Sequence, residues 1–249
     1  MIDSHCHLDD PHFSGDLKEV LLRAKQAGIQ QLIIPGVQHG QWSAQQALAA
    51  QYQNISNAFG IHPWYCDQHD NAHLEQLEKL LPHAIAVGEC GLDFMPNRPD
   101  HATQIKCFQK QLQLAQQFNL PLIIHSVKSA DQVALQLRPY PQLRGVIHGF
   151  SGSLQQAKVF IKLGFYIGIG TRLLQNEQRN QGQRIHTFLQ NLPLESLLLE
   201  SDAPDGLKNQ RNEPANLLDV AQSLATIRQI PLASVQKQCT LNTKELFSL

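Results

Sequence analysis

The sequence predicts a single (β/α)₈ barrel, or TIM barrel, that spans residues 1–249 and carries one extra helix at its C-terminus. Apolar runs of strand length alternate with amphipathic runs of helix length along the whole chain, in about eight βα units. The length of 249 residues fits one such barrel, and no linker or repeat divides it. An open doubly wound sheet would share this alternation, but no Gly-x-Gly-x-x-Gly turn follows the first predicted strand.

The predicted strands are short apolar runs, and the first opens the chain over residues 1–8. The other seven are expected at residues 31–35, 56–61, 84–89, 120–125, 144–148, 165–169 and 197–201. The helical patterns between these runs favour crossover connections and therefore parallel strands.

Between the strands, apolar residues recur at helical spacing. The helix expected over residues 16–27 places Val20 and Ala24 on one face and ends at Gly28. The same pattern predicts helices over residues 41–51, 72–81, 130–137, 153–163, 181–191 and 217–227. The clearest helix follows the fourth strand and carries Ile105, Phe108, Leu112 and Ala115 on one stripe. Pro231, which suits the first position of a helix, then opens the extra helix.

The composition narrows the class of protein. Hydrophobic residues make up 42% of the chain, which is enough for a substantial core, and the net charge of -1 gives no global attraction to nucleic acid. Any contact with nucleic acid must therefore be local.

The five cysteines contain no Cys-x-x-Cys pair, so we expect neither a disulfide framework nor a thiolate zinc site. We expect no leader peptide or membrane span, and a cytoplasmic location.

Residue types that bind metals lie at the ends of several predicted strands. The active site of a barrel forms where the C-terminal ends of the strands meet, so these side chains should converge on one mouth. The set consists of His5, His7, His62, Glu89, His125, His148 and Asp202. Even four of these five imidazoles, together with the two carboxylates, are too many ligands for one ion, and they suit two divalent cations with one bridging carboxylate. These ligand types are compatible with Zn, Mg, Mn, Ni or Fe.

Five motifs resemble those of the TatD family of metal-dependent deoxyribonucleases. They are His-x-His in the first strand, Gly-Glu-x-Gly-Leu-Asp after the fourth, Ile-His in the fifth, His-Gly-Phe-Ser-Gly in the sixth and Glu-Ser-Asp-Ala-Pro in the eighth. The resemblance covers essentially the whole chain. It implies that one metal is surrounded by His5, His7, Glu89 and Asp202, and that a second is held by His125 and His148, with Glu89 as the bridge. His-Gly-Phe replaces a common His-Cys-Phe, which leaves the ligand intact.

The mechanistic hypothesis is attack on a phosphodiester by a hydroxide that the two metals hold. Asp202 is expected to bind metal and to accept the proton of that water. His62 is expected to bind substrate phosphate or to protonate the leaving oxygen, unless it only fixes the Pro63–Trp64 loop. Glu200 either orients a ligand histidine or forms a plain buried pair. Arg211 either contacts phosphate or has no role.

Aromatic residues also follow the predicted strand ends, and they could stack on bases or merely roof the barrel. They are Trp64, Tyr65, Phe94 and Phe150.

The function that the resemblance implies is a 3′-to-5′ exodeoxyribonuclease acting on single-stranded DNA or DNA ends. The low charge also fits a small phosphorylated substrate. An alternative is a dinuclear metal hydrolase of a small ester, lactone or cyclic amide, and a third is a metal-binding protein without catalysis. The sequence does not determine the oligomeric state, and it is compatible with a monomer.

Overall fold

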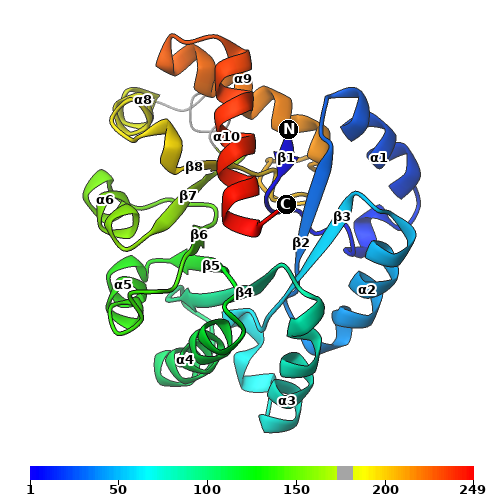
Figure 1. Ribbon diagram of the computed structural model, residues 1–249, viewed down its shortest axis with the longest axis vertical. Coiled ribbons are helices and arrows are strands. Elements are labelled where there is room, and N and C mark those ends of the chain that lie inside the picture. Colours follow the sequence, from blue (N-terminus) through cyan, green and yellow to red (C-terminus); the bar gives the residue numbers. More distant parts are fainter. Residues whose placement is uncertain (173–181) are drawn as a thin grey trace.

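The structure is a computed structural model, and it describes residues 1–172 and 182–249. Its strands form one sheet in which every adjacent pair is parallel, in the order β1 to β8, which confirms the predicted barrel (Figure 1). The strands are β1 (Ile2–Asp3), β2 (Gln31–Pro35), β3 (Ile55–Phe59), β4 (Ala86–Asp93), β5 (Leu122–Val127), β6 (Gly145–Ile147), β7 (Phe165–Ile169) and β8 (Leu197–Leu199).

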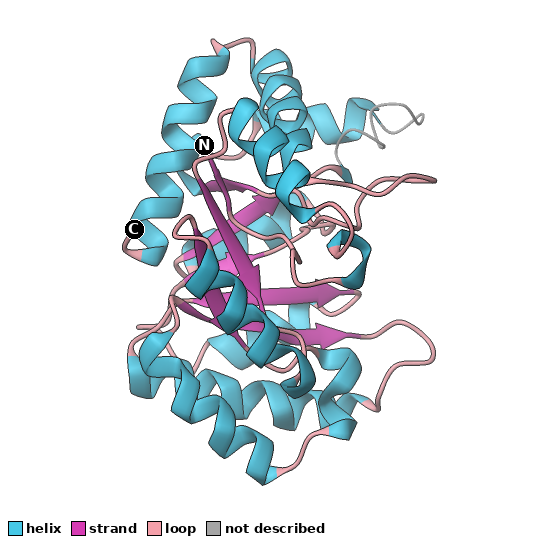
Figure 2. Cartoon of the chain, turned by 90° about the vertical axis from the view of Figure 1, so that its right-hand side faces the viewer, coloured by secondary structure: helices cyan, strands magenta, loops and turns pink. Residues whose placement is uncertain are grey.

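Helices surround the barrel, and the long loops project from the side toward which the strands point (Figure 2). The helices are α1 (Leu17–Gln26), α2 (Trp42–Gln51), α3 (Asn71–Leu80), α4 (His101–Phe118), α5 (Ala130–Leu137), α6 (Leu154–Lys162), α8 (Gly182–Gln190), α9 (Leu217–Arg228) and α10 (Leu232–Phe247). Of the helix predicted over 181–191, residue 181 lies outside the described residues. Within the described chain, no helix is both long and apolar enough to cross a membrane.

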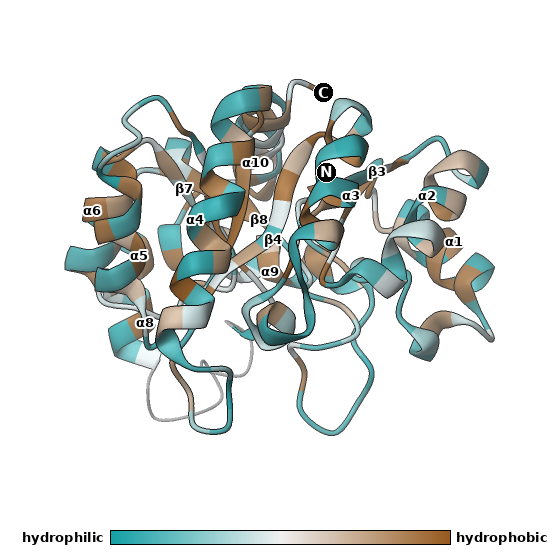
Figure 3. Ribbon diagram, turned by 90° about the horizontal axis from the view of Figure 1, so that it is seen from below, coloured by the Kyte–Doolittle hydropathy of each residue, from teal (hydrophilic) through white to brown (hydrophobic). Residues whose placement is uncertain are grey.

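The apolar core has two layers. The larger layer lies between the strands and the helices, and brown residues on the strands and helix sides mark it in Figure 3. The smaller layer fills the barrel itself with inward-facing residues, among them Ile33, Ile123 and Leu198. Leu246 and Phe247 at the end of α10 belong to this inner layer. The extra helix therefore closes the end of the barrel opposite the long loops.

Strand β4 differs from the prediction, which ended it at Glu89. It continues to Asp93, and its pairing with β5 shifts between Val87 and Cys90. A bulge of this kind re-aims a side chain within a strand. Gly88 permits it, because a Cβ there would lie 2.7 Å from Cβ of Ile123. Glu89 consequently lies inside the strand, at the bulge, and not at its end.

The first and last strands are shorter than predicted, and the chain beyond them forms hydrogen bonds across the barrel seam. The N–H of Ser4 donates to the Leu199 carbonyl at 3.0 Å. The N–H of Asp202 donates to the carbonyl of His5 at 2.9 Å, and that of His7 donates to the carbonyl of Ala203 at 2.7 Å. These bonds close the barrel and hold the His-x-His segment against the segment after β8.

We expect Asn242→Ala to destabilise the fold. The Asn242 side chain donates to the carbonyls of Leu194 and Leu197, both at 2.8 Å, and so ties α10 to the start of β8. Loss of the amide leaves these carbonyls without that donor, which should lower the free energy of unfolding by about 1–3 kcal/mol. Chemical denaturation measures it. Lys237→Ala, on an exposed position of the same helix, should change stability by less than about 0.5 kcal/mol and is the matched control.

Candidate metal centre

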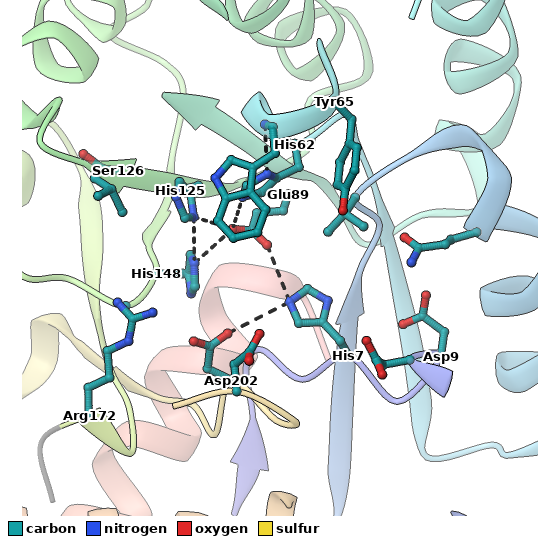
Figure 4. A pocket seen from close by; sticks show the side chains of 17 residues that line it. His7, Asp9, His62, Tyr65, Glu89, His125, Ser126, His148, Arg172 and Asp202 are labelled. Carbon is teal, nitrogen blue, oxygen red and sulfur yellow. Dashed lines mark hydrogen bonds and ion pairs between the residues drawn. The ribbon is translucent and has the colours of Figure 1, made fainter. Parts of the chain in front are cut away.

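The predicted site residues converge on one pocket at the C-terminal ends of the strands (Figure 4). The pocket has a volume of about 230 Å³. Six of the predicted residues line it, namely His7, His62, Glu89, His125, His148 and Asp202. The seventh, His5, is fully buried directly behind the pocket, with its Nε2 3.1 Å from Nε2 of His7.

Glu89 lies at the centre of the site, and its two oxygens face different imidazoles. Oε2 lies 3.3 Å from Nε2 of His5 and 3.6 Å from Nε2 of His7. Oε1 lies within hydrogen-bonding or ion-pairing distance of three further rings, those of His62 (3.3 Å), His125 (2.8 Å) and His148 (3.0 Å). Burial alone would raise the pKa of Glu89, but the surrounding imidazoles hold it well below its usual range.

The first group that could hold a cation consists of His5, His7 and Asp202. Oδ1 of Asp202 lies 3.8 Å from Nε2 of His5 and 4.0 Å from Nε2 of His7. Asp202 adopts a left-handed backbone with φ of 60°, a conformation that aspartate tolerates better than most residues. Two imidazole nitrogens and two nearby carboxylates form a ligand set that zinc and related cations bind.

The second group is built around His125 and His148, whose Nδ1 and Nε2 atoms lie 3.4 Å apart. Behind each ring is a buried carboxylate: Oδ2 of Asp93 lies 3.4 Å from Nε2 of His125, and Oε1 of Glu200 lies 3.6 Å from Nδ1 of His148. Carboxylates in this position fix the orientation of metal-binding histidines. Neither outer nitrogen has a hydrogen-bond partner of good geometry in the described structure.

The role of Asp93 was missing from the sequence interpretation. Residues four apart on a strand share a face, so Asp93 points to the same side as Glu89. The spacing of Glu89 and Asp93 could have revealed this role, but the predicted strand ended at Glu89 and did not include Asp93. Glu200 was already expected as a residue that orients a ligand histidine or forms a buried pair. Gly168 leaves the space for its carboxylate, because a Cβ at Gly168 would lie 2.4 Å from Oε2 of Glu200.

His62 can donate a hydrogen bond from Nε2. Its Nδ1 accepts the backbone N–H of Trp64 at 3.1 Å, which leaves the ring hydrogen on Nε2. Burial lowers the pKa of His62 to about 4, so the ring is neutral at pH 7. A neutral ring with Nε2–H is a hydrogen-bond donor and a poor metal ligand at that atom. The bond from Trp64 is the contact expected if His62 fixes the Pro63–Trp64 loop, and Nε2 of the ring lies 3.3 Å from Oε1 of Glu89.

Some candidate residues lie away from the pocket. Arg211 forms two bonds of 2.6 Å with the carboxylate of Asp16, so the alternative of a phosphate contact is not supported. Phe94 stacks on His101, with ring centroids 3.7 Å apart, and Phe150 stacks on Phe188.

Trp64 and Tyr65, two of the aromatic residues that the sequence offered for stacking on bases, do line the pocket. Arg172 also lines it and was missed, because a single arginine after a strand gives no distinguishing pattern.

We expect Glu200→Gln to weaken metal binding by about 10- to 100-fold while the fold is retained. The amide keeps the size of the side chain but removes the negative charge that faces Nδ1 of His148. Calorimetric titration with Zn²⁺ measures the affinity, and circular dichroism checks the fold. Glu195→Gln changes the same group at an exposed position and should bind metal like the wild type. Unchanged affinity in Glu200→Gln would remove the proposed orienting role.

We also expect metal binding to release protons at pH 7. Although burial alone would lower it, the carboxylates of Glu89 and Glu200 raise the pKa of His148 well above its usual range. The metal-free ring is therefore protonated at pH 7, and it must lose its proton to bind a cation. Metal affinity should fall as the pH falls. Titrations in buffers of different ionisation enthalpy count the released protons, and His148→Gln should release fewer. Equal release in both proteins would contradict this account.

Comparison with known proteins identifies the family of this chain. A model of the family described as TatD related DNase matches residues 2–248. The chain is 38% identical to an uncharacterized metal-dependent hydrolase, YjjV, of Escherichia coli K12, with 100% of this chain and 98% of the relative covered. It is 35% identical to the 3′-5′ ssDNA/RNA exonuclease TatD of Edwardsiella piscicida, with both chains covered completely.

The solved structures agree with the sequence relatives. The crystal structure of the E. coli TatD homologue YjjV superposes with a TM-score of 0.93 at 37% identity, over 100% of this chain and 98% of that one. A TatD family hydrolase from Entamoeba histolytica, at 23% identity, shares the fold with a TM-score of 0.88 over 99% of this chain and 97% of that one. The chain belongs to the TatD-related DNase family, as its motifs predicted.

Proposed function

We propose that this protein is a metal-dependent phosphodiesterase that removes nucleotides from the 3′ end of single-stranded DNA, using two divalent cations. The observation that carries the proposal is the position of Glu89, whose two oxygens face two separate sets of imidazoles. A carboxylate in this position suits a bridge between two metals. Membership of a family of metal-dependent hydrolases supports the same reading.

The two sets divide the proposed ligands. We assign His5, His7 and Asp202 to one cation and His125 and His148 to the other, with Glu89 shared. The nitrogens that face Glu89 support this division, because Nε2 of His5 lies near one oxygen, and Nδ1 of His125 and Nε2 of His148 lie near the other. When bound, divalent cations at such a centre lower the pKa of water and neutralise charge on phosphate oxygens. Elemental analysis of the purified protein would identify the bound cations among Zn, Mg, Mn, Ni and Fe.

The protein's own groups have the following proposed roles. Asp202 accepts a proton from the attacking water, because its carboxylate is at the pocket surface beside His7. His62 donates its Nε2–H to a phosphate oxygen. Arg172, the only arginine or lysine among the described residues that line the pocket, attracts the substrate phosphate.

The proposed substrate follows from relatives and from charge. Several relatives of this chain are named 3′-5′ ssDNA/RNA exonucleases. The pocket volume of about 230 Å³ suits one nucleotide end better than a duplex. The net charge of -1 likewise favours a short local contact.

We further propose that residues 1–249 act as one domain. A single chain supplies every residue assigned to the site, so a monomer suffices. The expected cytoplasmic location stays a prediction.

We expect metal removal to abolish nuclease activity and added Mg²⁺, Mn²⁺ or Zn²⁺ to restore it. The measurement is degradation of 3′-labelled single-stranded DNA, with RNA of the same sequence and panels of esters, lactones and cyclic amides assayed beside it. Asp202→Asn should lower turnover at least about 100-fold without loss of the fold. Asp67→Asn, on an exposed position, is the matched control. Restored activity on the small-molecule panels without any cleavage of DNA or RNA would overturn the proposed substrate.

A further inference from the structure

We propose that Trp64 and Arg98 form a nucleobase-binding subsite at the edge of the pocket. The base of a nucleotide beside the scissile phosphate would stack on the indole. This inference rests on the proposed nuclease function and goes beyond it, because it assigns the residues that recognise the nucleotide as distinct from those that bind metal.

Trp64 offers aromatic surface to a ligand in the pocket. It lines the pocket and is 39% exposed, although a tryptophan usually buries most of its surface. The indole is fixed and not loosely exposed, because its N–H donates to Oδ2 of Asp93 at 2.5 Å. Every base presents a π face, so a fixed exposed indole binds bases with little sequence preference.

Arg98 supports the indole from outside the pocket. Its guanidinium carbon lies 3.8 Å from the ring centroid of Trp64, and its Nε lies 3.4 Å from Oδ2 of Asp93. Trp64 lines the pocket and Arg98 does not. Within residues 1–172 and 182–249 its one ion pair is the contact of Nε with Asp93, so its terminal nitrogens can receive a phosphate of the nucleic-acid backbone; its side chain is 32% exposed.

The subsite is tied to the metal centre through one carboxylate. Oδ2 of Asp93 faces Trp64, Arg98 and Nε2 of His125 together. The indole centroid lies 5.0 Å from that of His62 and 6.3 Å from that of His125. A nucleotide whose base stacks on Trp64 therefore has its phosphate beside the imidazoles around Glu89.

The charges around the pocket favour a nucleic-acid backbone that approaches from the side of Trp64. Three acidic side chains besides Glu89 and Asp202 line the pocket, those of Asp9, Asp10 and Asp205. Asp9 lies on the His7 side, away from His125 (Figure 4). Acidic groups on that side repel a phosphodiester backbone, whereas Arg98 attracts it on the side of Trp64.

The kinetic test compares two single-stranded DNA substrates that differ by one base. One is intact, and in the other an abasic residue replaces the 3′-terminal or the penultimate nucleotide. The wild type should prefer the intact strand in kcat/KM by about 5- to 150-fold at one of these positions, the range for base–aromatic stacking. Trp64→Leu should reduce that ratio toward one, whereas Trp64→Phe, which keeps an aromatic ring, should retain most of it.

Two further variants complete the comparison. Arg98→Gln should raise KM for both substrates, because it removes a cation and the support of the ring. Arg138→Gln removes an exposed arginine after α5, outside the pocket, and should behave as the wild type. If Trp64→Phe and Trp64→Leu lower metal content and kcat equally while the ratio stays unchanged, Trp64 only positions Asp93 and the subsite is wrong. A wild-type ratio near one also overturns it.

A binding measurement separates this inference from the proposed function. The chain has two tryptophans, and Trp42 is only 3% exposed, so a pocket ligand should quench mainly Trp64. Thymidine 5′-monophosphate should quench the fluorescence, ribose 5-phosphate should not, and the change should disappear in Trp64→Phe. Quenching without cleavage of any oligonucleotide would keep the subsite and reject the nuclease. Cleavage without quenching by the nucleotide would reject the subsite and keep the nuclease.

Discussion

The site depends on one buried carboxylate surrounded by imidazoles. Glu89 is 2% exposed, and an ionised carboxylate so far from water is costly unless it is paired. Five histidine rings face its two oxygens, and they come from the segments that follow or end four different strands, β1, β3, β5 and β6. Because those segments are far apart in sequence, the charge of Glu89 can be compensated only when the barrel has closed.

The bulge in β4 makes this arrangement possible. It inserts Gly88 and Glu89 into the pairing with β5, and the strand then continues to Asp93 on the same face. One strand thus supplies the central carboxylate and also the carboxylate behind His125. Glu200 has the corresponding place behind His148. Imidazoles between an inner and an outer carboxylate are held in orientation before any ligand arrives.

The distribution of charge explains how a chain with a net charge of -1 can act on an anionic polymer. The pocket holds more carboxylates than guanidinium groups, so bound cations would supply most of its attraction for phosphate. In the proposed function, Arg172 at the pocket and Arg98 beside Trp64 would supply the rest locally. Recognition on this scale suits a terminal nucleotide, and it requires no basic surface elsewhere on the molecule.

The sequence by itself determined the barrel and the residues at its mouth. Apolar periodicity defines strands and helices, and parallel strands in a closed sheet bring their C-terminal ends together, so His5, Glu89 and His148 could be expected to meet. Only the tertiary structure decided which oxygen of Glu89 faces which ring, which nitrogen of His62 carries hydrogen, and that Arg211 binds Asp16. These outcomes depend on side-chain distances between remote segments and on a bulge in register. Local sequence patterns encode neither, because both are set by packing across the whole barrel.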